Sequence, residues 1–297
     1  MTLAVAHQDN KNLRLIADTR INDARSYASA RNTIYDGKIK AIVIHPELAL
    51  AYANHVEPAE EAIKQLFIDF RSMKNMPFTR PYEVLMHHHK GCNAETDFLI
   101  CDGLQNKIFR IQNEQIEHTN GRWIGDLQGF EKYQEAIHSS SKTNLNKSMD
   151  DALKTVIHDT SVESVGGYSV LITNKEMHGF QYTENATLES VRARTIKFDS
   201  PGQMVAIPLG TEEEGTGSVF QYCGCSLKDN CLRATAFYTH GASEGLLFLP
   251  WLSLDPIRVE GTNGSSFIKR VKATYNVALN GFDRHGSSAV MRISSFT

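Results

Sequence analysis

Residues 2–20 read TLAVAHQDNKNLRLIADTR, and this stretch decides the fold that the sequence predicts. Two apolar runs, LAVAH and LRLIA, flank the polar run QDNKN, which is the pattern of a β-hairpin. A second hairpin is predicted where KAIVI, residues 40–44, and LALAYA, residues 48–53, flank a His-Pro-Glu turn. The chain therefore opens with two hairpins rather than with alternating strands and helices.

The later segments extend this pattern. Apolar periodicity predicts helices and strands in the order helix, three strands, two helices and two strands, at residues 59–73, 97–101, 107–111, 115–118, 127–138, 148–157, 168–173 and 180–183. This grouping favours an α+β fold with largely antiparallel sheets flanked by helices. After about residue 196, short apolar runs alternate with Gly-rich turns. The sequence thus predicts one domain at 1–195 and a β-rich domain at 196–297.

Composition narrows the class of protein. The chain has 297 residues, 41% of them hydrophobic, and a net charge of −3, which gives no electrostatic reason to expect nucleic acid or an anionic membrane as a partner. The N-terminal residues lack a signal-peptide pattern, and no stretch approaches the roughly 20 apolar residues that span a bilayer. Five irregularly spaced cysteines do not form a disulfide framework. These features predict a cytoplasmic protein with reduced thiols.

Thr2 is the first candidate for chemistry. Removal of Met1 would give Thr2 a free α-amine with a pKa of roughly 7.7–8.0, which can take the proton of the hydroxyl. Threonine at this position is common, so the neighbouring residues must show whether Thr2 is a nucleophile. The first hairpin should bring Asp18 and Arg20 back towards Thr2, and Lys40 begins the next strand. A buried Lys40 would lower the pKa of the nucleophile, and a carboxylate such as Asp18 would offset its desolvation.

This pattern resembles the proteasome β-subunit and the related bacterial heat-shock protease subunit, and most closely bacterial proteasome-like homologues. In that family a nucleophilic Thr opens the mature chain, an ADxR segment closes the first hairpin, and a catalytic Lys precedes an AG pair. The corresponding elements are Thr2, Ala17–Arg20, and Lys40 thirteen residues before Ala53. The likeness extends more weakly to about residue 195.

The resemblance implies a four-layer αββα sandwich, the N-terminal-nucleophile hydrolase fold, with a β-rich C-terminal extension. It implies a threonine peptidase that acts on peptide or unfolded-protein substrates in a homo-oligomeric ring, with an unfoldase partner that the sequence does not identify. It requires neither a cofactor nor a metal. Ser164 matches the serine of the family's SGG strand, and Asn54 occupies the place of the glycine whose N–H serves the oxyanion hole. Tyr52 falls in the first specificity pocket, or is a plain core aromatic.

Other positions depart from the family pattern. Trp123 stands where the family has a supporting serine, and Asp159 lies near, but displaced from, the place of a second aspartate. Asn54 replaces a glycine, although Asn tolerates positive φ better than most residues. Two alternatives therefore stay open: an amidase or acylase that uses the same nucleophile on a small molecule, and a non-catalytic scaffold.

Two clusters suggest metal ligands but do not fit a metal site. Adjacent residues on a strand point to opposite faces, so His87, His88 and His89 are expected in a solvated turn or a packing cluster. Cys223, Cys225 and Cys231 lack a fourth ligand at standard zinc spacing, although His240 could supply one. The sequence therefore predicts no metal site.

Overall fold

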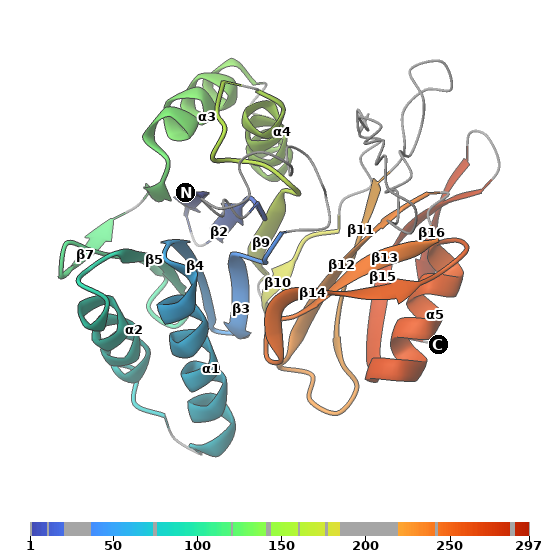
Figure 1. Ribbon diagram of the computed structural model, residues 1–297, viewed down its shortest axis with the longest axis horizontal. Helices are drawn as coiled ribbons and strands as arrows, with labels where there is room; N and C mark the ends of the chain where they lie inside the picture. Colours follow the sequence, from blue (N-terminus) through green and yellow to red (C-terminus); the bar gives the residue numbers. More distant parts are fainter. Residues whose placement is uncertain are drawn as a thin grey trace, which may run out of the picture.

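The computed structural model describes residues 2–10, 12–20, 37–73, 76–119, 121–140, 144–159, 161–175, 178–184, 219–240, 243–285 and 289–296 (Figure 1). Within these ranges the chain forms three antiparallel sheets and five α-helices. The fold is therefore mixed α and β, as the sequence predicts.

The first sheet contains the N-terminal hairpin. Its strands run in the order β10-β9-β2-β1-β8. Their bounds are Leu3–Asp9 for β1, Asn12–Ala17 for β2, Gly121–Gly125 for β8, Val170–Lys175 for β9 and Gly179–Tyr182 for β10. The predicted first hairpin is present, and β8, which the sequence did not reveal, pairs with the free side of β1. This places the start of β1 in the middle of a hydrogen-bonded sheet.

The second sheet begins with the second predicted hairpin. Its strands follow the chain in the order β3-β4-β5-β6-β7. They are Ala41–His45, Leu48–Asn54, Thr96–Asp102, Lys107–Gln112 and Gln115–Thr119. Every residue of β5 is buried, as are the first six of β4. These strands are buried because both faces of the sheet are covered, and β5 carries polar side chains at its two ends, at Thr96, Asp97 and Asp102.

Helix pairs cover the two sheets from opposite sides (Figure 1). The pair α1 (Val56–Ser72) and α2 (Arg80–Gly91) contacts the second sheet, and α4 (Leu145–His158), which packs against α3 (Leu127–Ser139), contacts the first. One apolar cluster joins the facing sheets with α1 and α2, and another joins β1 and β2 with α3 and α4. Burial of these apolar faces is the main force that holds the helices in place.

A C-terminal unit, here defined as the described residues of 219–296, forms the third sheet. Its strands run in the order β14-β13-β12-β11-β15-β16. They are Val219–Ser226 (β11), Arg233–Thr239 (β12), Glu244–Leu249 (β13), Ser253–Glu260 (β14), Val277–His285 (β15) and Ala289–Ser294 (β16). Helix α5 (Gly264–Tyr275) covers one face and shares an apolar cluster with these strands.

The C-terminal unit packs against the edges of the two N-terminal sheets. Strand β12 contacts β3 and β10, which are edge strands of different sheets. The rings of Tyr168 and Phe237 stack with centroids 4.2 Å apart, and the Ile39 N–H donates to the Leu254 carbonyl at 3.0 Å. One apolar cluster therefore runs across this junction.

Sequence patterns missed two helices. Helix α2 carries Pro81 near its start and three histidines near its end, which are weaker helix formers than alanine or leucine. Helix α5 follows Asn263, whose side chain forms a capping box with Ser266, in a region that the sequence predicted to be mainly β. The predicted domain boundary near residue 195 lies outside the described residues.

Candidate active site

The backbone of Thr2 is fixed at the start of β1. Thr2 is buried, with 3% of its surface exposed, and its carbonyl accepts a hydrogen bond from the Asp126 N–H at 2.7 Å. Gly125, on β8, has a φ of 102°, and a Cβ at this position would lie 1.7 Å from the Thr2 carbonyl oxygen. A glycine is therefore required here for β8 to approach Thr2.

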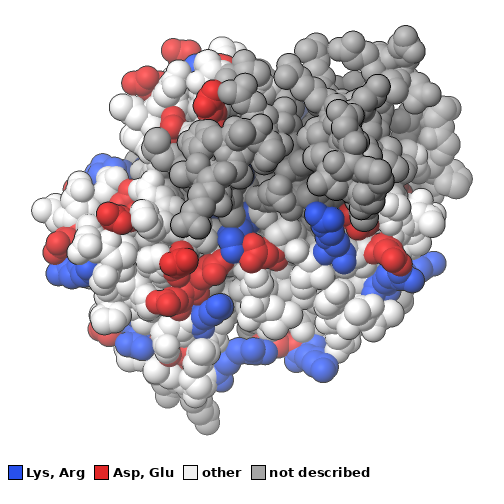
Figure 2. Space-filling view, in the orientation of Figure 1, with Lys and Arg blue, Asp and Glu red and all other residues white. Residues whose placement is uncertain are grey.

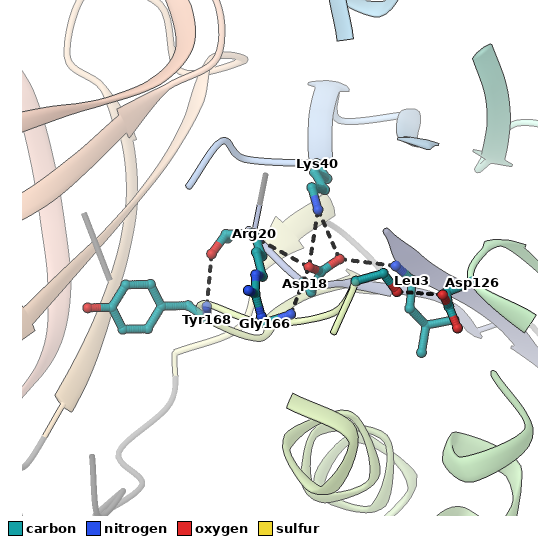
Figure 3. Close-up of polar contacts among 9 residues, drawn as sticks. Leu3, Asp18, Arg20, Lys40, Asp126, Gly166 and Tyr168 are labelled. Atoms are coloured by element: carbon teal, nitrogen blue, oxygen red, sulfur yellow. Dashed lines mark hydrogen bonds and ion pairs between the residues drawn. The ribbon is translucent and has the colours of Figure 1, made fainter. Parts of the chain in front are cut away.

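Asp18 is the centre of the site (Figure 3). Its carboxylate is fully buried, and Oδ1 accepts a hydrogen bond from the Leu3 N–H at 3.1 Å. Oδ2 accepts from the backbone N–H groups of Arg20 and Gly166, both at 3.1 Å. These three backbone donors satisfy the oxygens of a carboxylate that is buried away from water.

Lys40 reaches Asp18 from the other sheet. Its Nζ lies 3.2 Å from Asp18 Oδ1 and 3.1 Å from Oδ2, and its side chain is only 2% exposed. Burial lowers the pKa of Lys40, whereas the charge and hydrogen bonds of Asp18 act to raise it. The ion pair thus joins β2 to the residue that precedes β3, and it brings a buried cation next to the residue that follows Thr2.

Residues 18–20 are held by a glycine turn. The N–H groups of Thr19 and Arg20 both donate to the Gly166 carbonyl, at 3.3 and 3.0 Å, and Thr19 Oγ1 accepts from the Tyr168 N–H at 2.8 Å. A Cβ at position 166 would meet the Arg20 side chain at 2.7 Å. Arg20 therefore lies beside Gly166, and its positive charge contributes to the lowered pKa of Lys40.

Ser164 is connected to Thr2 through an intermediate residue. Its Oγ donates to Asp126 Oδ2 at 2.5 Å, and Asp126 Oδ1 accepts from the Gly129 N–H at 2.7 Å. Asp126 is the N-cap of α3, and its own N–H holds the Thr2 carbonyl. Sequence reasoning missed Asp126, although an Asp directly before the predicted helix at 127–138 is a typical capping signal.

Asn54 ends β4 in a left-handed conformation. Its φ is 73°, which an asparagine tolerates, and its side chain donates from Nδ2 to Asp97 Oδ2 at 3.2 Å. Gln112 donates to the same oxygen at 2.9 Å. Burial raises the pKa of Asp97, and these hydrogen bonds act in the opposite direction. Asn54 is the one exposed residue of β4, at the end of an otherwise buried strand.

Tyr52 is buried in β4 next to Lys40. Its N–H donates to the Lys40 carbonyl at 3.3 Å, and its side chain is 1% exposed. Among the described residues its hydroxyl has no hydrogen-bond partner. Burial raises its pKa well above the usual range, and the nearby charges of Glu60, Asp18 and Asp255 add to this effect.

Two departures from the family pattern have structural explanations. Trp123 pairs with Val5 across β8 and β1, and its ring stacks on Phe130 at 4.6 Å, so it packs helix α3 against the first sheet. Asp159 forms an ion pair with Lys132 and accepts from Ser161. These contacts lower the pKa of Asp159 to about 2. Within the described residues, neither Trp123 nor Asp159 forms a hydrogen bond or ion pair with Asp18 or Lys40.

The histidine cluster lies on helix α2, so the prediction of a strand or turn geometry for it was wrong, whereas the alternative prediction of a packing cluster holds for His89. His89 is buried in α2, where its Nδ1 bonds the Thr96 carbonyl at 2.6 Å and its Nε2 accepts from the Glu114 N–H at 2.9 Å. Both ring nitrogens are therefore used in packing α2, one onto β5 and the other onto the turn between β6 and β7. Within the described ranges, no three His, Cys, Asp or Glu side chains are arranged to hold a metal ion.

The surface carries charged side chains of both signs. Acidic and basic side chains are interspersed on the face seen in Figure 2, in keeping with the small net charge of −3. In the part of the chain that the structure describes, no helix has the length and apolar character needed to cross a membrane.

Comparisons with known proteins give similarity to solved structures. No protein-family model matches the sequence, and no curated protein matches it. Among solved structures, the chain is similar to eukaryotic HslV from Trypanosoma brucei, with a TM-score of 0.42 and 11% sequence identity. The similarity covers 58% of this chain and 98% of that chain.

Proposed function

We propose that this chain is a threonine peptidase of the N-terminal-nucleophile type, with Thr2 as the nucleophile once Met1 has been removed. One observation carries the proposal. The buried carboxylate of Asp18 accepts hydrogen bonds from both the Leu3 N–H and the Nζ of Lys40. A cation is costly to bury, and here it shares a carboxylate with the backbone N–H of the residue that follows the candidate nucleophile. That arrangement suits a site that needs positive charge at the moment when a hydroxyl loses its proton.

The proposed reaction is hydrolysis of an amide. Thr2 Oγ attacks the carbonyl carbon while the Thr2 α-amine takes the hydroxyl proton, and the carbonyl π electrons move to the oxygen. The C–N bond then breaks, and its nitrogen leaves with the proton from the α-amine. Water attacks the resulting ester and gives one proton back through the amine, so the acid product leaves and Thr2 is regenerated.

The other predicted residues have supporting roles in this proposal. Lys40 stabilises the developing negative charge on Oγ, Asp18 holds Lys40, and Arg20 adds positive potential. The backbone N–H groups near Asn54 serve the oxyanion, and Tyr52, which is only 1% exposed, takes the role of a core aromatic beside Lys40 rather than of a pocket wall. Ser164 acts indirectly, because its hydroxyl holds the carboxylate of Asp126, whose N–H holds Thr2.

We further propose that the two facing sheets and their helix pairs form the four-layer αββα sandwich of N-terminal-nucleophile hydrolases. The β-rich C-terminal unit is then a separate domain added to that sandwich. Peptide or unfolded-protein substrates and assembly into a homo-oligomeric ring follow from the same proposal. The mass of the native particle in solution tests assembly, and a monomer would contradict a ring.

The nucleophile is tested by labelling. The purified protein is sequenced from its N-terminus and its intact mass is measured before and after treatment with a peptide epoxyketone, which reacts with both the hydroxyl and the α-amine of an N-terminal threonine. We expect Thr2 as the first residue and one adduct. Thr2→Ala should abolish the adduct and Thr2→Ser should retain it at a lower rate. A retained Met1, or an adduct that survives Thr2→Ala, would refute the proposal.

The substrate class needs a second measurement. The wild-type protein is given an unfolded protein and a set of small acylated amines, and released amine is quantified. Cleavage of the polypeptide with no release from the small amides supports the peptidase. The opposite result would make the chain a small-molecule amidase with the same nucleophile, and no hydrolysis of either would favour a scaffold.

A further inference from the structure

The two residues that precede Lys40 are bonded to the C-terminal unit. The Ile39 N–H donates to the Leu254 carbonyl of β14 at 3.0 Å. Lys38 Nζ lies 2.8 Å from Asp255 Oδ1 and 2.9 Å from Oδ2. The same Nζ lies 2.5 Å from Glu60 Oε1, on α1. Two consecutive residues of β14 thus hold the two residues that precede Lys40.

The other side of this segment is bonded to the hairpin that carries Asp18. The Lys38 N–H donates to the Thr19 carbonyl at 2.8 Å, and Gly37 forms a β-bridge with Arg20. A Cβ at position 37 would come within 2.7 Å of the Thr19 oxygen. The segment 37–40 is therefore fixed between the end of β2 and strand β14, and this clamp determines where Lys40 begins its reach towards Asp18.

The charges at the junction favour a persistent contact. Burial acts to lower the pKa of Lys38, but its hydrogen bonds with Asp255 and Glu60 and their charges outweigh this, so its pKa is raised. Lys38 therefore stays positively charged at neutral pH. Side-chain exposure is 17% for Lys38, 23% for Glu60 and 60% for Asp255, so the contact with Asp255 is the one most open to water.

We propose that the C-terminal unit is a working part of the catalytic site, in which Asp255, acting through Lys38, is a positioning residue for Lys40. This inference rests on the proposed function, because Lys40 must act on Thr2 for its position to affect a rate. A misplacement of about 1 Å far from the reacting atoms can lower a rate by about a hundredfold. An ion pair as exposed as that of Asp255 controls only part of such a displacement, since it contributes about 1 kcal/mol or less.

The test uses the full-length protein and the kinetics of epoxyketone labelling. Asp255→Asn should lower the limiting rate of adduct formation about fivefold, the factor that corresponds to about 1 kcal/mol, and leave the half-saturating concentration unchanged. Asp255→Glu should restore most of the rate. The matched control is Glu260→Gln, also on β14, whose carboxylate pairs with Arg270 on α5 away from the site. Its rate should equal that of the wild type.

A double-mutant cycle tests whether Asp255 acts through Lys38. In a Lys38→Met background, Asp255→Asn should have no further effect on the labelling rate. The inference is overturned if Asp255→Asn labels as fast as Glu260→Gln, or if it slows labelling equally with and without Lys38. A change only in the half-saturating concentration would also overturn it, because that result indicates a substrate contact.

Hydrogen exchange separates this inference from the proposed function. The Ile39 amide should exchange faster in Asp255→Asn than in the wild type or in Glu260→Gln, because its bond to Leu254 opens more often. An unchanged Ile39 amide refutes the clamp whatever the activity. If the wild type forms no adduct while the Ile39 amide responds as expected, the proposed function fails, and the clamp is a structural contact with no role in positioning a catalyst.

Discussion

Lys40 and Lys38 are two residues apart, yet they lie in regions of opposite character. The Lys40–Asp18 pair is buried, with exposures of 2% and 0%, and joins two sheets of the N-terminal part. The Lys38–Asp255 pair has exposures of 17% and 60% and joins that part to the C-terminal unit. The first has three backbone N–H groups on its carboxylate, whereas the carboxylate of the second is open to solvent on the surface.

This difference shows that an ion pair can fix the position of a segment without contributing much to the free energy of unfolding. A buried pair is intolerant of change, since removal of one partner leaves the other charged and unsolvated. An exposed pair tolerates change and contributes little to stability, although it can still fix the position of a segment. We therefore expect the effects of substitution to decrease from the Asp18 region outwards to the junction.

The largest effect on stability is expected for Lys40→Met. This change leaves the Asp18 carboxylate buried without its cation and should lower the free energy of unfolding by about 3–5 kcal/mol. Adding Asp18→Asn to this variant should recover part of the loss, because the uncompensated charge disappears. Urea denaturation at neutral pH measures both. A loss below about 1 kcal/mol would mean that the buried pair is no more costly to break than an exposed one.

A slightly smaller effect is expected for Gly125→Ala. The added Cβ meets the Thr2 carbonyl oxygen and carbon at 1.7 and 2.7 Å, and the φ of 102° is strained for alanine. We expect a loss of about 3 kcal/mol together with slower labelling of Thr2. Gly91→Ala is the control, since nothing lies within 4 Å of a Cβ at the end of α2. Equal melting temperatures for the two variants would contradict the close approach of β8 to Thr2.

An intermediate and pH-dependent effect is expected at Asp97. Because burial raises its folded-state pKa above the unfolded value of 3.8, the folded protein holds this proton more tightly than the unfolded chain does. The free energy of unfolding should therefore fall as pH rises through the range between these two pKa values. Asp97→Asn should remove that fall. The free energy of unfolding of the variant, relative to that of the wild type, should therefore rise with pH. Denaturation curves at several pH values from about 4 to 7 test this sign, and a constant difference would contradict it.

The smallest effect on stability is expected for Asp255→Asn. Loss of this exposed carboxylate should lower the free energy of unfolding by less than about 1 kcal/mol, and high salt should reduce the difference further. Thermal or urea unfolding at low and high salt measures it. A loss of unfolding free energy as large as that of Lys40→Met would contradict the expected difference between the buried Lys40 pair and the exposed Lys38 pair.

The sequence predicted the parts of the fold and site that depend on local pattern. The two hairpins follow from alternating apolar and polar runs, and the closure of the first hairpin is enough to place Asp18 near the start of β1. The spacing of apolar residues every three to four positions predicted the bounds of α1, α3 and α4 to within a few residues.

The rest depends on contacts between distant segments. Asp126 holds Thr2 only because β8 pairs with β1, and no local pattern shows which strand takes that place. Asp255 lies 217 residues from its partner Lys38, in a region that the sequence predicted only as a β-rich appendage. Ser164 was identified from the family pattern, but its contact with Asp126 could not be, since sequence reasoning missed Asp126 altogether.

The hydrogen bonds of Asp18 also determine when, during synthesis of the chain, the site can form. Its carboxylate is completed by the N–H of Gly166, which lies 148 residues later in the chain. During synthesis, Thr2 and Lys40 leave the ribosome long before Gly166 exists, and Asp255 follows later still. Under the proposed function, the nucleophile of a nascent chain is therefore unsupported until more than half of the protein has been made. On the same proposal, the order of synthesis delays completion of the site, so that neighbouring unfinished chains do not meet an active enzyme.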